Sequence, residues 1–139
     1  MNYWLFKSEP GAWSWADQLS KGDQGEDWDG VRNFQAANNM KKMKIGDMGF
    51  FYHSVTEKRI VGIVDVIEEY KPDPTDLSKR FGMVKVRALQ TLNYPVTLSD
   101  IKKNIKLSDL ALIKQSRLSV VPLTSDHWKI ICHMAKTSA

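Results

Sequence analysis

The apolar run at residues 59–67 is the feature that most restricts how this chain can fold. It reads Arg59-Ile60-Val61-Gly62-Ile63-Val64-Asp65-Val66-Ile67 and is rich in β-branched side chains. A continuous run of this length and composition is typical of a central β-strand. A glycine inside a strand often marks a bulge or a close approach by another group. The run therefore predicts a sheet with this strand near its centre.

Four other segments are expected to be strands. Residues 3–7 are aromatic and apolar, and residues 48–53 are joined to the central strand by a connection of hairpin length. Residues 83–89 alternate between apolar and polar positions, as in a half-buried strand. Residues 119–122 end in a proline, which places this short strand at an edge or an end of the sheet. We expect one sheet to contain residues 3–7, 48–53, 59–66 and 83–89.

Residues suited to a helix N-cap predict several short helices. They are Ser14, Thr97 and Thr124. Ser14 and Thr97 are each followed three residues later by a carboxylate, which is the spacing of a capping box. Residues 31–40 are also expected to be helical, with Phe34 and Ala37 facing the core. The sequence thus predicts the α+β class: a partly closed antiparallel β-barrel of about five or six strands with short surrounding helices, in a single domain over residues 1–139.

The composition is that of an ordinary globular domain. The chain has 20 Lys and Arg against 16 Asp and Glu, a formal charge of +4, which permits a nucleic-acid partner without requiring one. Charges interrupt every apolar run before the ~18 residues of a membrane span, and the first residues lack the pattern of a signal peptide. Because Cys132 is the single cysteine, we expect a reducing compartment: the cytoplasm, or the nucleus if the source is eukaryotic.

The sequence predicts no cofactor and no metal site. The histidines His53, His127 and His133 accompany one cysteine and show no ligand spacing. No Walker or dinucleotide-binding glycine pattern is present. We expect a monomer that associates with no membrane and has no catalytic activity.

Four segments resemble the EVE domain family. They are Tyr3-Trp4-Leu5-Phe6-Lys7-Ser8-Glu9-Pro10, Trp28-Asp29-Gly30-Val31-Arg32-Asn33-Phe34-Gln35-Ala36, Gly46-Asp47-Met48-Gly49-Phe50-Phe51-Tyr52-His53-Ser54 and Ser116-Arg117-Leu118-Ser119-Val120. They occur in the expected order over nearly the whole chain, which is similar to the short bacterial members. The resemblance implies a PUA-like fold related to the YTH domains, which bind N6-methyladenine in RNA. It also implies binding of modified bases, with methylated or hydroxymethylated cytosine the usual suggestion for DNA.

A protein that reads a flipped base needs flat apolar faces for stacking, and the resembling segments contain several. The stacking candidates are Trp13, Trp15, Trp28 and Tyr52. Trp28 stands among Asp and Gly residues in a predicted loop, so its removal is expected to leave the protein folded. Core packing is the competing interpretation of Trp15 and Trp28, and Trp4 and Trp128 are assigned to the core.

The base edge and the phosphates need polar partners. The candidates for the base edge are Ser8, Asn33, His53 and Ser54, and those for the phosphates are Lys7, Arg32 and Arg117. The competing interpretations are a turn residue for Ser8, an N-cap for Asn33 and a structural histidine for His53. Arg117 would in the same way be a structural arginine that ties a loop to backbone carbonyls.

Two other functions compete with a reader of modified bases in DNA or RNA. A small amidohydrolase-like enzyme acting on a modified nucleoside would use Lys7 and Glu9 as base and acid, with Ser8 as nucleophile or positioning group. Consecutive strand positions point in different directions, which argues against that grouping. A protein-interaction module would instead expose its tryptophans as a surface patch. We expect a nucleic-acid partner whose modified base is held flipped in an aromatic pocket.

Overall fold

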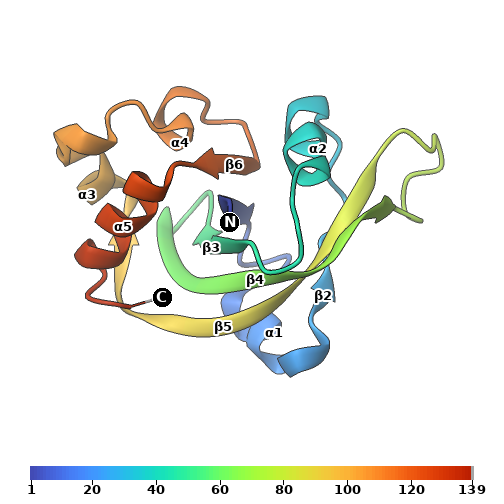
Figure 1. The fold of residues 1–139 in the computed structure, drawn as a ribbon, viewed down its shortest axis with the longest axis horizontal. Coiled ribbons are helices and arrows are strands. Elements are labelled where there is room, and N and C mark those ends of the chain that lie inside the picture. Colours follow the sequence, from blue (N-terminus) through green and yellow to red (C-terminus); the bar gives the residue numbers. More distant parts are fainter. Residues whose placement is uncertain (139) are drawn as a thin grey trace.

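Six strands form one sheet in the computed structural model, which describes residues 1–138 (Figure 1). Their hydrogen-bonded order is β2-β5-β4-β3-β1-β6. The strands are β1 (Tyr3–Ser8), β2 (Glu26–Asp27), β3 (Met48–His53), β4 (Arg59–Pro72), β5 (Gly82–Thr97) and β6 (Val120–Leu123). The segments expected to share a sheet do so, and the predicted central strand lies within β4, between β3 and β5.

The sheet is mixed, although an antiparallel one was predicted. β1 and β3 run parallel, with Leu5 opposite Phe50, and the other neighbouring pairs are antiparallel. Parallel neighbours need a long crossover connection, which residues 9–47 supply with α1 (Trp15–Ser20) and α2 (Phe34–Lys41). The α+β class and the strand number are confirmed. The described strands do not close into a barrel, because the hydrogen-bonded order ends at β2 and at β6.

β4 and β5 form a longer hairpin than the sequence indicated. β4 continues to Pro72 and β5 to Thr97, past the expected strand ends near residues 67 and 89. Several register shifts interrupt their pairing, one of them beside Gly62, and such bulges bend strands. The hairpin therefore curves around the body of the protein, and its tip extends beyond it (Figure 1).

Short helices surround the sheet. Besides α1 and α2 they are η1 (Gly22–Gln24), α3 (Leu98–Lys103), η2 (Ile105–Leu107), α4 (Ala111–Lys114) and α5 (Ser125–Met134). The predicted caps at Ser14, Thr97 and Thr124 are confirmed, because each side-chain oxygen accepts a hydrogen bond from a backbone N–H of the first turn. No helix within residues 1–138 is long and apolar enough to cross a membrane.

Helix α2 begins later than predicted. The Asn33 side chain accepts a hydrogen bond from the backbone N–H of Ala36 (2.9 Å), so Asn33 is the N-cap and the helix starts at the next residue. Phe34 was expected in the core and is 60% exposed. Ala37 is buried as predicted, together with Ala36 and Met40. Only the placement of Phe34 in the core is therefore wrong.

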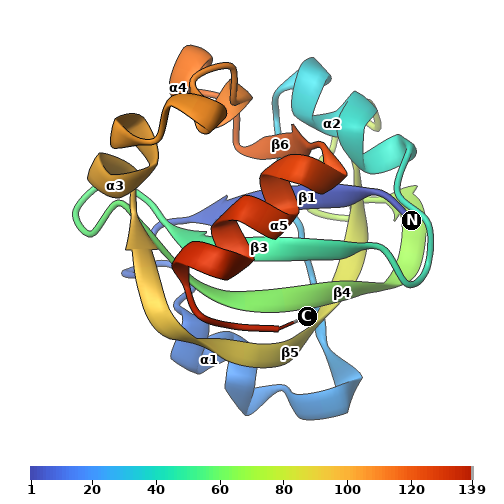
Figure 2. The ribbon, with the colours of Figure 1, turned by 60° about the vertical axis from the view of Figure 1, so that its left-hand side comes forward.

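Helix α5 lies across β1 and β3 (Figure 2). Trp128 stacks on Phe50, with ring centroids 4.0 Å apart, and on Tyr3 at 4.7 Å. Trp4 and Trp128 are both buried, as predicted. This packing covers the two parallel strands on one side, and the last residues of these strands, Ser8 and His53, are neighbours in the sheet.

Candidate functional site

A cavity of about 510 Å³ opens beside the end of β1 and beside β2. Small-molecule sites commonly have volumes of about 300–1,000 Å³. Five residues predicted for base or phosphate binding line this cavity: Lys7, Ser8, Trp13, Trp28 and Arg32. Four carboxylates line it as well: Glu9, Glu26, Asp27 and Asp29. The cavity therefore combines two indole rings with charged groups of both signs.

Trp13 is held in the cavity wall by a tight turn after β1. The Ser8 hydroxyl donates a short hydrogen bond to the Trp13 carbonyl (2.5 Å), and the Trp13 backbone N–H donates to the Glu9 carbonyl (3.0 Å). The indole Nε1–H donates to the side-chain oxygen of Gln18 (2.9 Å), which is itself buried. Trp13 remains half-buried. One indole face is thus positioned before any ligand arrives, which lowers the entropy cost of stacking.

Trp28 belongs to the core as well as to the cavity wall. It is 8% exposed and meets Phe6 and Phe51 edge-on, with ring centroids 5.2 and 5.6 Å apart. Its backbone N–H donates to the Val84 carbonyl (2.7 Å), which extends the pairing of β2 with β5. Trp28 follows β2 in an irregular segment, as expected of a loop residue, but its burial favours the core-packing interpretation, so we now expect its removal to cost stability.

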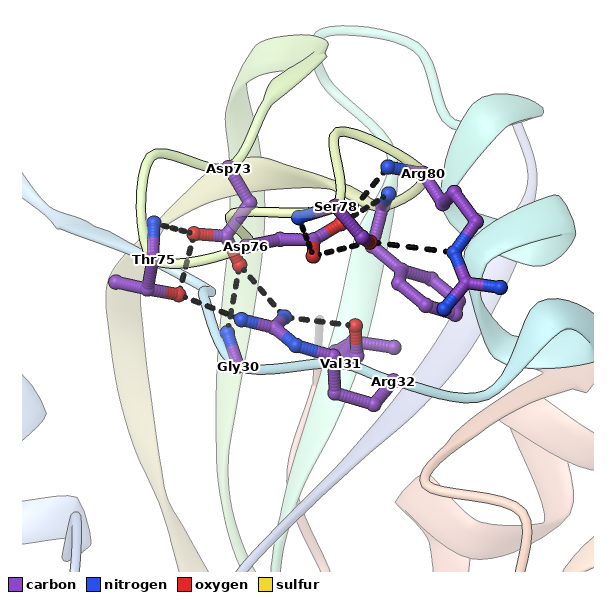
Figure 3. A network of polar contacts seen from close by, with 9 residues as sticks. Gly30, Val31, Arg32, Asp73, Thr75, Asp76, Ser78 and Arg80 are labelled. Atoms are coloured by element: carbon purple, nitrogen blue, oxygen red, sulfur yellow. Dashed lines mark hydrogen bonds and ion pairs between the residues drawn. The ribbon is translucent and has the colours of Figure 1, made fainter.

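The wall at residues 30–32 is held by the loop between β4 and β5 (Figure 3). Gly30 has a positive φ of 80°, and its N–H donates to the Asp73 carboxylate (2.8 Å). The Arg32 guanidinium donates to the same carboxylate (3.1 Å) and to the Thr75 hydroxyl (2.9 Å). The Asp73 side chain is fully buried, whereas that of Arg32 is 40% exposed. Arg32 therefore fastens the cavity wall, a role that the phosphate prediction did not include.

The Asp73 carboxyl is ionised in spite of its burial. Burial by itself would raise its pKa, but the Thr75 hydroxyl, the N–H groups of Gly30 and Thr75, and the Arg32 guanidinium donate to it and together lower the pKa. Asp76 fixes the rest of the loop by accepting from Ser78, from the Arg80 N–H and from the Phe81 N–H. Led by the Ser78 hydroxyl, these donors lower the pKa of Asp76 to about 2.

Stability at low pH should depend on Asp76. Its pKa is about 2 in the folded protein against an ordinary value of 3.8. A carboxyl with a lowered folded pKa stabilises the folded state above its unfolded pKa, and that contribution disappears as the pH falls through the folded pKa. We therefore expect the free energy of unfolding to fall between pH 3.8 and about 2, and Asp76→Asn to flatten this part of the profile. Denaturant titrations at several pH values measure it, and equal slopes for both proteins would contradict it.

The carboxylates of the cavity differ in their partners. Asp27 pairs with Lys71 at 3.0 Å and lies 4.0 Å from Lys85. Glu9, Glu26 and Asp29 form no ion pair with the described residues. A carboxylate is a hydrogen-bond acceptor only, so these groups suit a ligand edge that carries N–H donors.

Lys7 connects the cavity to the loop before β6. Its ammonium group donates to the Ser116 carbonyl (2.8 Å), and burial lowers its pKa. Arg117 and Asn33 lie in a separate depression of about 320 Å³. Neither is among the described residues that line the larger cavity. The structure therefore separates these two predicted site residues from the others.

Trp15 and Tyr52 are core residues and do not line the described cavity. The Trp15 ring lies directly over Gly62, where an added Cβ would come within 2.3 Å of it, and its Nε1–H donates to the Thr91 hydroxyl (2.9 Å). Gly62 therefore marks both the bulge and the close approach that the sequence indicated. Tyr52 is 3% exposed, and burial raises its pKa. The core interpretation of Trp15 is confirmed.

His53 and Ser54 form hydrogen bonds with the backbone of segments next to the cavity. The His53 Nε2 accepts from the Trp15 backbone N–H (3.0 Å), and its Nδ1 lies 2.9 Å from the Glu57 carboxylate. Because Nε2 needs its lone pair for this contact, the proton is placed on Nδ1. The Ser54 N–H donates to the Ser8 carbonyl (2.9 Å). The structural interpretation of His53 is confirmed, and neither side chain lines the described cavity.

Two features of the site have almost no signal in the sequence. Asp73 stands in the segment Pro72-Asp73-Pro74, which indicates only a break in the chain, and its partner Gly30 is 43 positions away. The Asp and Gly residues around Trp28 predicted only a loop, although Glu26, Asp27 and Asp29 line the cavity. The interaction-module hypothesis requires tryptophans exposed as a surface patch. Trp4, Trp15, Trp28 and Trp128 are buried, however, and Trp13 is half-buried.

No group of three or more potential metal ligands occurs among residues 1–138.

Comparisons with known proteins identify a single family. The family model described as EVE domain matches residues 2–134. Thymocyte nuclear protein 1 of Mus musculus is 31% identical over 98% of this chain and 74% of its own length. The crystal structure of an Agrobacterium tumefaciens protein is 48% identical and superposes with a TM-score of 0.95, covering 99% of this chain and 94% of that one.

Two of the similar structures were solved with a nucleic acid that carries a modified base. The human THYN1 protein, solved in complex with DNA containing 5-methylcytosine, is 28% identical, with a TM-score of 0.91 and 100% of both chains covered. A YTH domain from Zygosaccharomyces rouxii is 14% identical with a TM-score of 0.55, which shows a shared fold only.

Proposed function

The chain belongs to the EVE domain family, and from that premise we propose that it binds nucleic acid by seating a modified base, flipped out of its strand, in the cavity lined by Trp13 and Trp28. The observation that carries this proposal is the cavity itself. It offers a positioned indole, carboxylate acceptors and, at Lys7, an ammonium group in one space of about 510 Å³. A flipped base needs a stacking face, partners for its edge and a cation for its backbone.

The carboxylates favour a base with an exocyclic amino group. Cytosine and adenine carry such a donor on the edge that pairs in a duplex, and Asp or Glu side chains accept from the cytosine N4 amino group. Glu26 and Asp29 line the cavity and are the acceptors we assign to this edge. The human THYN1 protein, 28% identical over the whole chain, has been solved with 5-methylcytosine-containing DNA. We therefore rank 5-methylcytosine first, with 5-hydroxymethylcytosine and N6-methyladenine as the comparison ligands.

Replacing Trp13 by alanine tests the proposal. We expect binding to a strand with one 5-methylcytosine to weaken about tenfold or more, because base–aromatic stacking contributes about 1–3 kcal/mol. Trp13 is half-buried, so the variant should stay folded. Titrations of labelled modified and unmodified strands measure the effect, with a melting curve for each protein.

Tyr94→Ala is the matched control, because Tyr94 is an aromatic residue of β5 that is 57% exposed and does not line the cavity. Its affinity should equal that of the parent. If Trp13→Ala bound the modified strand as the parent does, the base would have to be seated elsewhere.

The enzyme hypothesis has one observation in its favour, because Lys7, Ser8 and Glu9 all line the cavity. The Lys7 ammonium and the Ser8 hydroxyl, however, already donate to the carbonyls of Ser116 and Trp13. A serine whose proton points at a carbonyl is not poised to transfer it to a base. Incubation with a modified nucleoside, followed by chromatography, separates the two functions. A new product that disappears in Ser8→Ala would favour the enzyme.

A further inference from the structure

We propose that the loop between β4 and β5 is a second nucleic-acid contact, whose Leu77 enters a DNA duplex and fills the space left by the flipped base. The inference rests on the proposed function, because it assigns the partner of that cavity as double-stranded DNA. It concerns residues 73–81, which form the tip that extends beyond the body (Figure 1).

The loop is attached directly to the cavity wall. Asp73 accepts from the Gly30 N–H, and Thr75 accepts from the Arg32 guanidinium, while Gly30 and Arg32 line the cavity (Figure 3). Leu77 follows Thr75 by two positions, so its Cα lies within about 7 Å of that of Thr75. Successive bases of one DNA strand are about 3.4 Å apart. The Cα of Leu77 is therefore at most about two base steps from that of Thr75, which accepts from Arg32 in the cavity wall.

Leu77 is unusually exposed for its type. It is 92% exposed, the highest value among the large hydrophobic residues that the structure describes. Its surroundings suit DNA, because Lys79 and Arg80 follow it in the same loop. Basic side chains bind phosphates by releasing their counterions. An apolar side chain followed by two cations thus suits both the base stack and the backbone of DNA.

Hydrogen bonds hold the loop on both sides of Leu77. Asp76, next to Leu77, accepts hydrogen bonds from Ser78, Arg80 and Phe81, and Asp73 accepts from Thr75 on the other side. The backbone on both sides of Leu77 is therefore fixed by buried carboxylates. A preformed loop loses little entropy when it binds, so the apolar side chain can be presented at small cost.

The physical role follows from the gap that flipping creates. When a base leaves the stack, its neighbours lose their apolar contacts and water enters. Leucine is one of the side chains that proteins insert between base steps. A leucine in the gap restores these contacts and opposes the return of the base. A single strand has no partner stack to fill, so the loop should matter for the duplex and much less for the single strand.

Leu77→Ala tests the proposal, with 5-methylcytosine DNA as the probe, both as a duplex and as the same strand without its complement. We expect duplex binding to weaken about tenfold, in line with the cost of unstacking a base step, and single-strand binding to change less than about twofold. Leu77→Met keeps a long apolar side chain and should bind the duplex like the parent. Because Leu77 is exposed, none of these variants should change the melting temperature.

Ile105→Ala is the matched control. Ile105 is 85% exposed and lies in η2, which follows α3 at the opposite end of the long axis of the molecule from the hairpin tip (Figure 1). Its duplex binding should equal that of the parent. The insertion proposal is overturned if Leu77→Ala binds the duplex normally, or if it weakens both forms of DNA equally. If instead the parent does not distinguish modified from unmodified DNA in either form, the proposed function itself fails.

Discussion

Trp28→Ala should lower the free energy of unfolding by about 3–5 kcal/mol, the usual cost of truncating a buried aromatic residue to alanine. The reason is the packing of this indole against Phe6 and Phe51, both fully buried, together with its own 8% exposure. Urea or thermal unfolding measures the loss. Trp13→Ala should cost less, because Trp13 is half-buried.

Trp28→Phe separates stability from binding. Phenylalanine keeps much of the apolar contact with Phe6 and Phe51, so the variant should stay folded and lose only part of the stability. Its affinity for a modified strand then reports the contribution of the indole to the cavity. A Trp28→Ala protein as stable as the parent would contradict the core assignment. It would support the original expectation that Trp28 can be removed while the protein stays folded.

Asp73→Ala should loosen the cavity wall and lower the free energy of unfolding by about 1.5–3 kcal/mol, the range for hydrogen bonds to charged groups. The change leaves the Gly30 N–H and the Arg32 guanidinium without their shared acceptor. Arg32 is 40% exposed and can turn to water, which keeps the loss below that of a fully buried ion pair. Hydrogen exchange of the Gly30 amide, together with denaturant unfolding, measures both effects.

Glu26→Gln is the control for Asp73→Ala, because it removes a carboxylate from the same cavity without touching the contacts of Asp73 or the Gly30 peptide bond. Gly30 should exchange faster in Asp73→Ala and unchanged in Glu26→Gln. An unaltered Gly30 exchange rate in Asp73→Ala would show that the wall keeps its conformation without the loop between β4 and β5.

The local structure was predictable because its signals are local. The β-branched run that became β4 and the caps at Ser14, Thr97 and Thr124 depend on residues a few positions apart. Periodicity and capping act over that distance. For the same reason the sequence supplied both interpretations of Asn33, and its side chain contacts the Ala36 N–H as a cap requires.

Part of the site was also predictable. Lys7 and Ser8 stand in one of the motifs that resemble the EVE family, and Trp28 and Arg32 stand in another; all four line the cavity. Asn33 and Arg117 come from the same kinds of motif but lie in another depression. A motif gives the position of a residue in the chain, whereas the cavity that the residue lines depends on how distant segments pack together.

The sequence by itself determined the α+β class, the main strands, the helix caps and the family. Only the tertiary structure decided that β1 and β3 run parallel, that Trp28 is buried, and that Asp73 holds Gly30 from 43 positions away. These features depend on which distant segments pack together. β2 illustrates the reason: it has two residues, too few for a local signal, and it is a strand because β5 supplies its hydrogen-bond partners.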